Sequence, residues 1–341
     1  MRICIAGAGA IGGFMGGMLS AAGNDVTFVT LGDDLDAIRS DGLKIHFPGG
    51  TLRTFNDVRA TDDLKAVGPH ELIILAVKAN QIAAICRDLP AVYGPETVVL
   101  TVQNGIPWWY FKRCGGAFAG RRLECEDPTG LIESNIPADR VIGCVAYPAV
   151  ERVAPGVLRH IEGTRFPVGE LDGSNTERVQ TIAETLNRAG FKAPVLSDIR
   201  GEIWLKALGA LAFNPISALT RATLVEICRF PETRMLATRM MQEAEEIARR
   251  FGVTLRLPIE RRIAGAEAVG AHRTSMLQDA ENGRPLEIDA LLLSVIELGR
   301  LTDAPTSNME AVYACTKLLD RILTATAAGT ERDGIRTGAV A

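Results

Sequence analysis

Histidine, aromatic residues and paired cysteines are scarce in this sequence of 341 residues. Four histidines and the absence of any C-x-x-C pair leave no spacing typical of a zinc or redox centre, so we expect no metal. The seven cysteines are an odd number, which favours reduced, structural thiols. The sequence also lacks a signal peptide and any run of about 18 apolar residues, so we expect a cytoplasmic protein with no membrane span.

A surplus of basic residues is missing as well. The formal net charge of -4 argues against nucleic acid as a partner, because phosphate binding normally leaves a basic footprint. Hydrophobic residues at 47% and charged residues at 23% are ordinary for a globular protein. Since one domain typically spans roughly 100 to 200 residues, the length predicts two domains.

Strand and helix patterns alternate over the first part of the sequence. Residues 2–6 (RICIA) predict a short buried strand, residues 10–22 a helix that ends at Gly23, and DVTFVT the next strand. The alternation continues with a helix near 33–41, the strands LKIHF and ELIILAV, a helix over 79–88 and the strand TVVLTV. This alternation is typical of an α/β fold with a parallel, doubly wound sheet.

The pattern changes near residue 196. Residues 121–170 hold weaker strand signals and precede a helix over 175–189 and the strand KAPVL. Beyond them the sequence predicts helices over DIRGEIWLKALGALAF, from Pro215 onward, and over 232–251, 258–270, 272–281, 285–303 and 306–326. We therefore expect an α/β domain over 1–196, an all-α helical domain over 197–328 and a loose tail over 329–341.

The stretch AGAGAIGG fits the G-x-G-x-x-G pattern of a dinucleotide-binding turn. Gly7 permits a tight turn, Gly9 lets the backbone approach a pyrophosphate, and Gly12 lets the helix pack closely on the strand. Because a strand precedes it and a helix follows, the pattern predicts a Rossmann-type cofactor site, formed by Gly7, Ala8, Gly9, Ala10, Ile11 and Gly12. Simple helix packing or another nucleotide-like ligand is the alternative.

The residues after the second strand bear on the choice between NAD and NADP. An acidic residue there is typical of NAD sites, and an arginine of NADP sites. This sequence has Thr30 and Leu31 at that place, with Asp33 and Asp34 just beyond. Neither pattern is matched, so both cofactors stay open on the residues alone.

Polar residues follow two further strands of the predicted sheet. Lys78 ends ILAVK, and Asn104 belongs to QNG after VVLTV. Open α/β sheets bind ligands at the carboxyl ends of their strands. Lys78 is therefore a candidate for binding a phosphate or carboxylate, and Asn104 for a nicotinamide or a substrate carbonyl. A solvated loop lysine and a turn residue before Gly105 are the alternatives.

Lys206 is the only charged residue in the apolar segment IWLKALGALAFNPISAL. A helix that is apolar nearly all round is buried, and a buried ammonium needs a specific partner or a lowered pKa. Such a lysine can donate a proton near neutral pH, which makes Lys206 a candidate general acid. The alternative is an i, i+4 ion pair with Glu202, worth about 0.2–0.5 kcal/mol on an exposed helix.

Three more polar residues stand out in the helical part. Asn214 and Pro215 predict the N-cap and first residue of a new helix. Ser275 and Glu287 lie in the segment HRTSMLQDAENGRPLEID. With Pro285 as the first residue of a helix, Glu287 falls at the third position, where a carboxylate commonly caps the helix.

Taken together, GAGAIGG, VKANQ, VQNG, IWLKAL…NPISAL and TSMLQD…LEID resemble the ketopantoate reductase (2-dehydropantoate 2-reductase) family, from residue 1 to about 325. The resemblance implies a Rossmann domain and a helical domain with the active site between them. It also implies NADPH-dependent reduction of a branched 2-oxo acid, ketopantoate to pantoate in pantothenate biosynthesis. Family members often carry an arginine where Leu31 stands, so NADH stays possible.

The resemblance implies roles for individual residues. Lys206 would be the general acid for the ketone oxygen, and Glu287 would orient that lysine and hydrogen-bond the product hydroxyl. Ser275 would hold the substrate carboxylate, while Asn104 and Asn214 would position substrate and nicotinamide. Hydride delivery to a keto carbon builds negative charge on oxygen, which a preorganised ammonium stabilises.

The resemblance also implies that Lys78 would bind near cofactor and substrate. The aromatic run from Trp108 to Phe111 is interpreted as core, with a lid over the substrate pocket as the alternative. Competing functions are a β-hydroxyacid or opine-type dehydrogenase and a non-catalytic dinucleotide-sensing protein. The apolar helices of the second domain are sufficient to support a homodimer.

Overall fold

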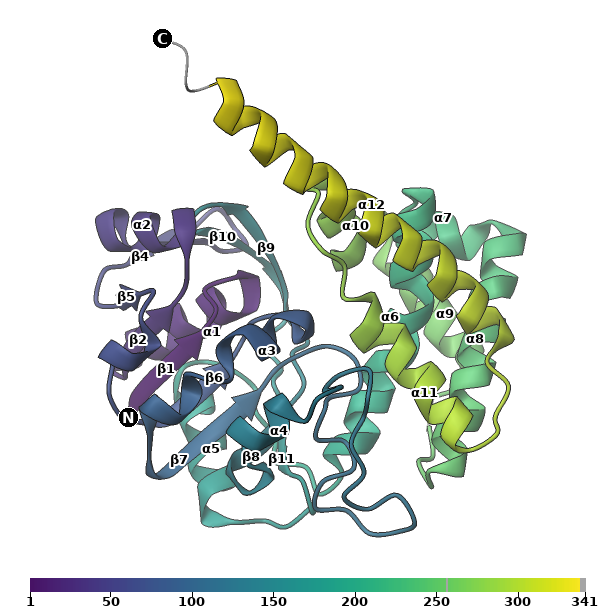
Figure 1. Ribbon diagram of the computed structural model, residues 1–341, viewed down its shortest axis with the longest axis horizontal. Helices are drawn as coiled ribbons and strands as arrows, with labels where there is room; N and C mark the ends of the chain where they lie inside the picture. The colour runs from purple at the N-terminus through teal and green to yellow at the C-terminus, as the bar shows by residue number, and fades with distance from the viewer. Residues whose placement is uncertain (256, 338–341) are drawn as a thin grey trace. The chain divides into compact units, whose positions relative to one another are not determined.

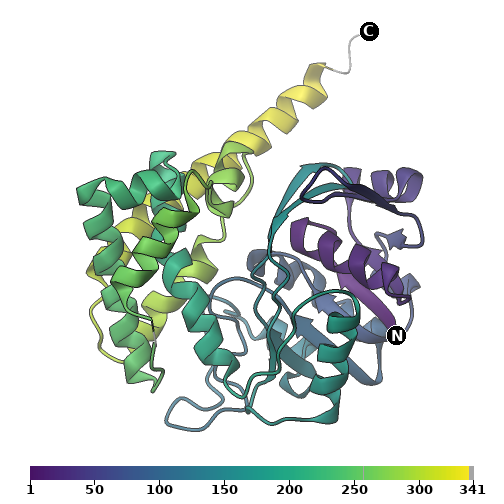
Figure 2. The same ribbon diagram turned by 180° about the vertical axis from the view of Figure 1, so that it is seen from behind.

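The computed structural model describes residues 1–255 and 257–337 (Figures 1 and 2). The chain divides into two compact units, Met1–Glu202 and Ile203–Ala341. Their boundary falls inside helix α6 (Ile199–Thr220), whereas a boundary at residue 196 was expected. The reason is that the first turn of α6 packs on the sheet of the first unit, with Ile199 against the backbone at Gly143 and Gly169.

The first unit is built on a seven-stranded sheet with the order β11-β8-β7-β6-β1-β2-β5. All neighbouring strands are parallel except β11, which runs antiparallel to β8. The expected α/β fold with a doubly wound, mainly parallel sheet is confirmed. The strands are β1 (Arg2–Ala6), β2 (Asp25–Val29), β5 (Arg59–Thr61), β6 (His70–Leu75), β7 (Tyr93–Thr101), β8 (Val141–Cys144) and β11 (Val168–Glu170).

A second sheet of four strands has the order β4-β3-β10-β9. It contains LKIHF, which was expected to continue the alternation of the main sheet. Helix α1 (Ala10–Ala21) lies between the two sheets: Gly13 abuts Leu158 of the second sheet, and Gly16 abuts Phe28 of the main one. Only glycine lets the helix approach both sheets so closely. The strands are β3 (Leu43–His46), β4 (Leu52–Phe55), β9 (Ala149–Ala154) and β10 (Val157–Glu162).

The remaining elements of the first unit depart from expectation in two places. The helix expected over 79–88 is two short pieces, η2 (Ala79–Gln81) and α3 (Ile82–Ile85). KAPVL forms only isolated bridges, since Pro194 has no N–H to donate. The other helices are α2 (Gly32–Asp41), η1 (Leu64–Ala66), η3 (Leu89–Val92), α4 (Leu131–Asn135), η4 (Ala138–Arg140) and α5 (Glu177–Arg188).

The aromatic run after β7 belongs to the interior of the first unit. Trp108, Trp109, Tyr110 and Phe111 are all buried, and the indole N–H of Trp109 donates to Thr101 Oγ1 of β7 at 3.0 Å. These contacts support the core interpretation of this segment over the lid.

The described residues of the second unit form helices joined by loops, with no strand, as predicted. Helix α12 runs to Thr337 and so enters the segment 329–341 that was expected as a loose tail. Residues 338–341 lie outside the described part of the chain. The helices after α6 are α7 (Leu224–Arg229), α8 (Pro231–Arg250), α9 (Ile259–Val269), α10 (Ser275–Glu281), η5 (Asp289–Leu293), α11 (Ser294–Leu301) and α12 (Ser307–Thr337).

Candidate active site

Three loops interlock at the carboxyl edge of the main sheet. The turn after β1 donates from Gly7 N to Val29 O of β2 at 2.9 Å. The Gln103 amide, just after β7, donates to the carbonyls of Leu75 and Val77 at 2.5 and 3.0 Å and so ties the β7 loop to the β6 loop. Because β1 lies between β2 and β6, the chain reverses its direction of strand addition here. Open α/β sheets bind ligands at such a switch point.

The three glycines of the turn serve different needs. At Gly7, with φ +105°, a Cβ atom would lie 2.9 Å from Val77 N, and at Gly12 a Cβ would lie 2.0 Å from the Gly7 carbonyl oxygen. The chain's own packing therefore requires both glycines. A Cβ at Gly9 would meet nothing within 4 Å. Open space beside backbone N–H groups at the start of α1 fits a pyrophosphate, which needs close backbone approach and a helix N-terminus.

Lys78 and Asn104 lie at the same edge as this turn. Lys78 is half-buried and precedes η2, where its backbone N–H donates to Gln81 Oε1 at 3.2 Å. Asn104 is half-buried and is followed by Gly105 at φ +85°. The main sheet thus brings both predicted polar residues to the carboxyl edge that carries the glycine turn.

The first turn of α6 is fixed to the first unit by side chains. Asp198 accepts from Gly201 N at 2.8 Å and caps the helix. The Arg200 guanidinium donates to the carbonyls of Tyr110 at 2.7 Å and Lys112 at 2.6 Å, and also to that of Leu171. Burial lowers the pKa of Arg200. Sequence reasoning missed this arginine, although a cation in the first turn of an apolar helix was a usable signal.

Glu202 completes this attachment, one helical turn before Lys206. Its Oε1 accepts from the Tyr147 hydroxyl at 2.8 Å and from the Arg165 guanidinium. Burial, followed by the hydrogen bond to Glu202, raises the pKa of Tyr147. The glutamate that was weighed as a partner for Lys206 is therefore engaged by two residues of the first unit. Lys206 itself is half-buried on the apolar helix.

The expected helix start at Asn214 and Pro215 is wrong. Helix α6 continues through Pro215 to Thr220, so Asn214 is a half-buried residue inside the helix and not an N-cap. Proline in a helix interior costs about 3 kcal/mol. Burial of neighbouring side chains such as Leu211 and Ile216 offsets that cost.

The expected capping position of Glu287 is also wrong. The helix begins after Glu287, whose backbone carbonyl accepts from Leu291 N at 3.1 Å. The backbone N–H of Leu286 donates a hydrogen bond to Asp320 Oδ1 of α12 at 2.8 Å. This contact holds the segment before Ile288 outside the helix. Glu287 is half-buried there. Ser275 is exposed at the first position of α10, where the preceding Thr274 is the cap and accepts from Leu277 N at 3.2 Å.

The described residues form no metal-binding cluster and include one helix long enough to cross a membrane. No group of three or more histidine, cysteine or acidic residues within 1–255 and 257–337 is arranged to hold a metal ion. Helix α6 is long and apolar enough to cross a membrane by length and composition, and 61% of its most apolar stretch is buried inside the protein. Core helices meet the same criteria, so this is weak evidence for a span.

A mainly parallel sheet with an open glycine turn at its switch point defines the class of Rossmann-type, dinucleotide-binding proteins. Residues 3–173 match the family model "Ketopantoate reductase PanE/ApbA", and residues 198–320 match its C-terminal counterpart. The chain belongs to the ketopantoate reductase family, whose members are oxidoreductases that use a nicotinamide dinucleotide.

Individual relatives agree with this assignment. A 2-dehydropantoate 2-reductase of Mesorhizobium japonicum is 47% identical over 94% of this chain and 98% of the relative. A crystal structure described as a putative ketopantoate reductase from Ralstonia solanacearum has a TM-score of 0.89 at 37% identity, covering 94% of this chain and 98% of that one. A D-mandelate dehydrogenase solved with NADH and anilino(oxo)acetate shares the fold at a TM-score of 0.81 and 21% identity, covering 95% and 99%.

Proposed function

We propose that this protein reduces a branched 2-oxo acid with a nicotinamide dinucleotide, and that the substrate is ketopantoate, which becomes pantoate in cytoplasmic pantothenate biosynthesis. The observation that carries the proposal is that both family models align in order, with the glycine turn in the first and Lys206 in the second. The 47% identity to a named 2-dehydropantoate 2-reductase over nearly the whole chain supports the substrate.

In the proposed reaction, Lys206 is the proton donor. When bound, the dinucleotide supplies the hydride that reduces the keto carbon. Lys206 stabilises the negative charge that develops on the ketone oxygen and then donates the proton to it. Its half-buried place on the apolar helix α6 suits this role, because partial burial strengthens the attraction between the ammonium and the developing negative charge. Glu287, also half-buried, orients this lysine and accepts from the product hydroxyl.

The other polar residues hold the reactants. Ser275, exposed at the N-terminal end of α10, binds the substrate carboxylate. Asn104 and Asn214 position the substrate carbonyl and the nicotinamide through their amides. Lys78 binds beside the cofactor at the edge that also carries the glycine turn. The backbone of Gly7, Ala8, Gly9, Ala10, Ile11 and Gly12 binds the pyrophosphate.

The test is oxidation of NADPH and of NADH, followed by absorbance, with ketopantoate and a panel of other 2-oxo acids. For Lys206→Ala, we expect kcat to fall about 100- to 1000-fold while Kd for the cofactor stays within about twofold, because the lost donor acts in the transition state. Lys192→Ala removes an exposed lysine of the first unit and serves as the matched control. Absence of turnover of every 2-oxo acid with either cofactor would contradict the proposal.

Three other functions are distinguished by variations of this assay. The likeness in fold to a D-mandelate dehydrogenase favours a related hydroxyacid dehydrogenase, which predicts faster oxidation of another hydroxy acid, tested in the reverse reaction, than of pantoate. An opine-type dehydrogenase is tested by adding an amine to the 2-oxo acid. A dinucleotide-sensing protein predicts cofactor binding without consumption and no effect of Lys206→Ala.

We also propose a homodimer formed through the helical unit. Helix α12 exposes Leu318 and Ile322, which lie one turn apart on the same face and are 58% and 55% exposed. Such apolar surface is typical of association sites. Light scattering during gel filtration measures the mass, and a monomer at micromolar concentration contradicts this part of the proposal.

A further inference from the structure

The end of strand β2 is the part of the cofactor site that distinguishes the two nicotinamide dinucleotides. In Rossmann folds the ribose that carries either a 2′-hydroxyl or a 2′-phosphate lies against the residues that follow this strand. Here these are Thr30, whose N–H donates to Thr61 O at 2.9 Å, and Leu31, which is 72% exposed at the start of α2. An exposed leucine side chain offers no hydrogen bond and no charge to a phosphate.

Carboxylates from two adjacent loops gather at this end of the sheet. Asp33 and Asp34 lie in the first turn of α2. Asp62 and Asp63 follow β5, whose last residue pairs with Val29 at the end of β2. The N-terminus of α2 would otherwise favour an anion, but its first turn already carries two negative charges of its own.

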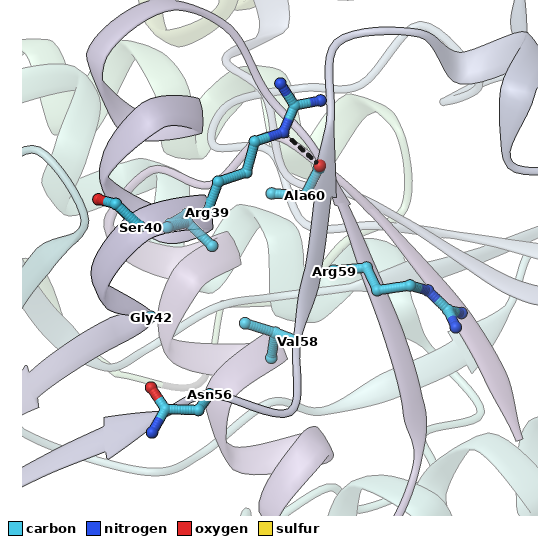
Figure 3. Close-up of a pocket in the computed structure, with 8 residues that line it drawn as sticks. Arg39, Ser40, Gly42, Asn56, Val58, Arg59 and Ala60 are labelled. Carbon is cyan, nitrogen blue, oxygen red and sulfur yellow. Dashed lines mark hydrogen bonds between the residues drawn. The ribbon is translucent and has the colours of Figure 1, made fainter.

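The two arginines near these carboxylates are both engaged. Arg152 of β9 donates to both carboxylate oxygens of Asp34 at 3.0 Å, and Asp34 also accepts from Gly156 N at 3.0 Å. Arg39 donates to Ala60 O at 3.0 Å, as Figure 3 shows, and pairs with Asp62 at 3.7 Å. Each arginine therefore compensates one aspartate.

Distance also separates Arg39 from the start of α2. It lies near the other end of the helix, about 10 Å from Gly32 at 1.5 Å per residue. Asp33 makes no ion pair with any described residue, so no cationic side chain neutralises its charge at the start of α2.

We propose that this protein selects NADH over NADPH through Leu31 and Asp33. The inference rests on the dinucleotide binding of the proposed function and departs from the NADPH implied by the family resemblance. A 2′-phosphate carries a charge of about -1.5 to -2 at pH 7 and would meet an uncompensated carboxylate without a cation. A 2′-hydroxyl carries no charge and can donate a hydrogen bond to a carboxylate, so NADH meets no such repulsion.

The experiment is direct titration of the full-length protein with NADH and with NADPH, without substrate, followed by nicotinamide fluorescence and calorimetry. For wild type we expect Kd for NADH to be at least tenfold lower than for NADPH. Leu31→Arg introduces a cation and is expected to shift the Kd ratio toward NADPH by tenfold or more. The shift is larger at low ionic strength because salt screens exposed charges.

Two further variants sharpen the result. Asp33→Asn removes the uncompensated charge and is expected to shift the ratio toward NADPH by a smaller factor, about threefold. Leu52→Arg makes the same exchange at another exposed leucine of the first unit, which is 50% exposed on β4, and is expected to leave the ratio unchanged. Thermal unfolding with each dinucleotide verifies that all variants are folded.

The outcomes separate this proposal from the proposed function. Equal or tighter binding of NADPH by wild type overturns it, and loss of that NADPH affinity in Arg152→Met would identify Arg152 as the phosphate ligand instead. If NADH binds preferentially but no 2-oxo acid is reduced, the selectivity stands and the reductase assignment falls. If neither dinucleotide binds, both fall.

Discussion

The glycine turn after β1 and the first turn of α6 are both attached firmly to the main sheet, but by opposite means. The glycine turn is shaped by backbone atoms: Gly7 and Gly12 are needed because any Cβ there would collide with other parts of the turn or the β6 loop. The start of α6 is held by long side chains, chiefly Arg200 with three carbonyl partners and Glu202 with Tyr147 and Arg165.

We expect the glycine turn to tolerate substitution less well than the first turn of α6. A backbone-shaped turn has no freedom to adapt, because its close contacts are between main-chain atoms that cannot rotate away. A side-chain attachment spreads its energy over several hydrogen bonds, each worth about 1 kcal/mol net or somewhat more with a charged donor. Substitutions in the two regions should therefore fail in different ways.

The largest effect is expected within the glycine turn itself. Gly12→Ala places a Cβ 2.0 Å from the Gly7 carbonyl oxygen and 2.8 Å from Ala76 Cβ, so the turn must distort. We expect a loss of about 3 kcal/mol in the free energy of unfolding and more than 100-fold in dinucleotide affinity. Urea unfolding and dinucleotide titration measure the two quantities.

Gly9→Ala is the matched variant that separates packing from binding. With φ -64° and nothing within 4 Å of its Cβ, alanine fits there, so stability should change by less than about 1 kcal/mol. Affinity should still fall at least tenfold, because the new methyl group occupies the space available to the pyrophosphate. Full affinity in this variant would show that the dinucleotide does not approach Gly9.

The same contrast explains how much the sequence could predict. The strand, glycine turn and helix over residues 2–21 were predicted closely, because the glycine spacing reports a backbone geometry that few other sequences adopt. The polar residues Lys78 and Asn104 were placed at the right edge for the related reason that parallel strands share one carboxyl edge.

Predictions failed where distant side chains decide. Pro215 signals a helix start in isolation, yet burial of the apolar faces of α6 keeps the helix continuous. Pro285 predicts another helix start, but Asp320, far along the chain, accepts a hydrogen bond from the N–H of Leu286, and the helix begins later. The short strands β4 and β5 carry mostly exposed or half-buried residues, so they lack the alternating hydrophobic pattern that marks a strand.

A smaller effect is expected at the side-chain attachment of α6. Arg200→Met leaves three carbonyl oxygens without their donor, so we expect about 2 kcal/mol lower stability and an unchanged glycine turn. Arg200→Lys keeps the charge but cannot reach three carbonyls, and should recover less than half of the loss.

Urea unfolding of these two variants beside Arg188→Met, an exposed arginine on α5, measures the difference. Kd for the dinucleotide should stay within about threefold of wild type at temperatures where the variants are folded. Stability equal to that of wild type in Arg200→Met would mean that the three hydrogen bonds do not hold the start of α6.

The smallest effect concerns Glu170, which ends β11 beside the Leu171 carbonyl that Arg200 contacts. Burial raises the pKa of this carboxyl, but hydrogen bonds from Arg178 and Thr176, at 2.6 Å each, outweigh it and leave the pKa below its usual value. A carboxyl with a lower pKa in the folded state stabilises the protein above the unfolded pKa of about 4.3. That contribution is lost as pH falls through the folded value.

We therefore expect Glu170→Gln to flatten the decline in stability between pH 5 and pH 3 by on the order of 1 kcal/mol, in addition to lowering stability at pH 7. Glu184→Gln, at an exposed carboxyl on α5, is the control and should decline as wild type does. Urea midpoints at each pH provide the measurement. An unchanged decline in Glu170→Gln would place the acid sensitivity in other carboxyls, of which Asp172 is the first to test, because hydrogen bonds from Ser174 lower its pKa to about 2. Glu170, next to a carbonyl that holds the start of α6, should therefore make stability depend on pH, whereas the glycine turn over residues 7–12 contains no titratable side chain and should not.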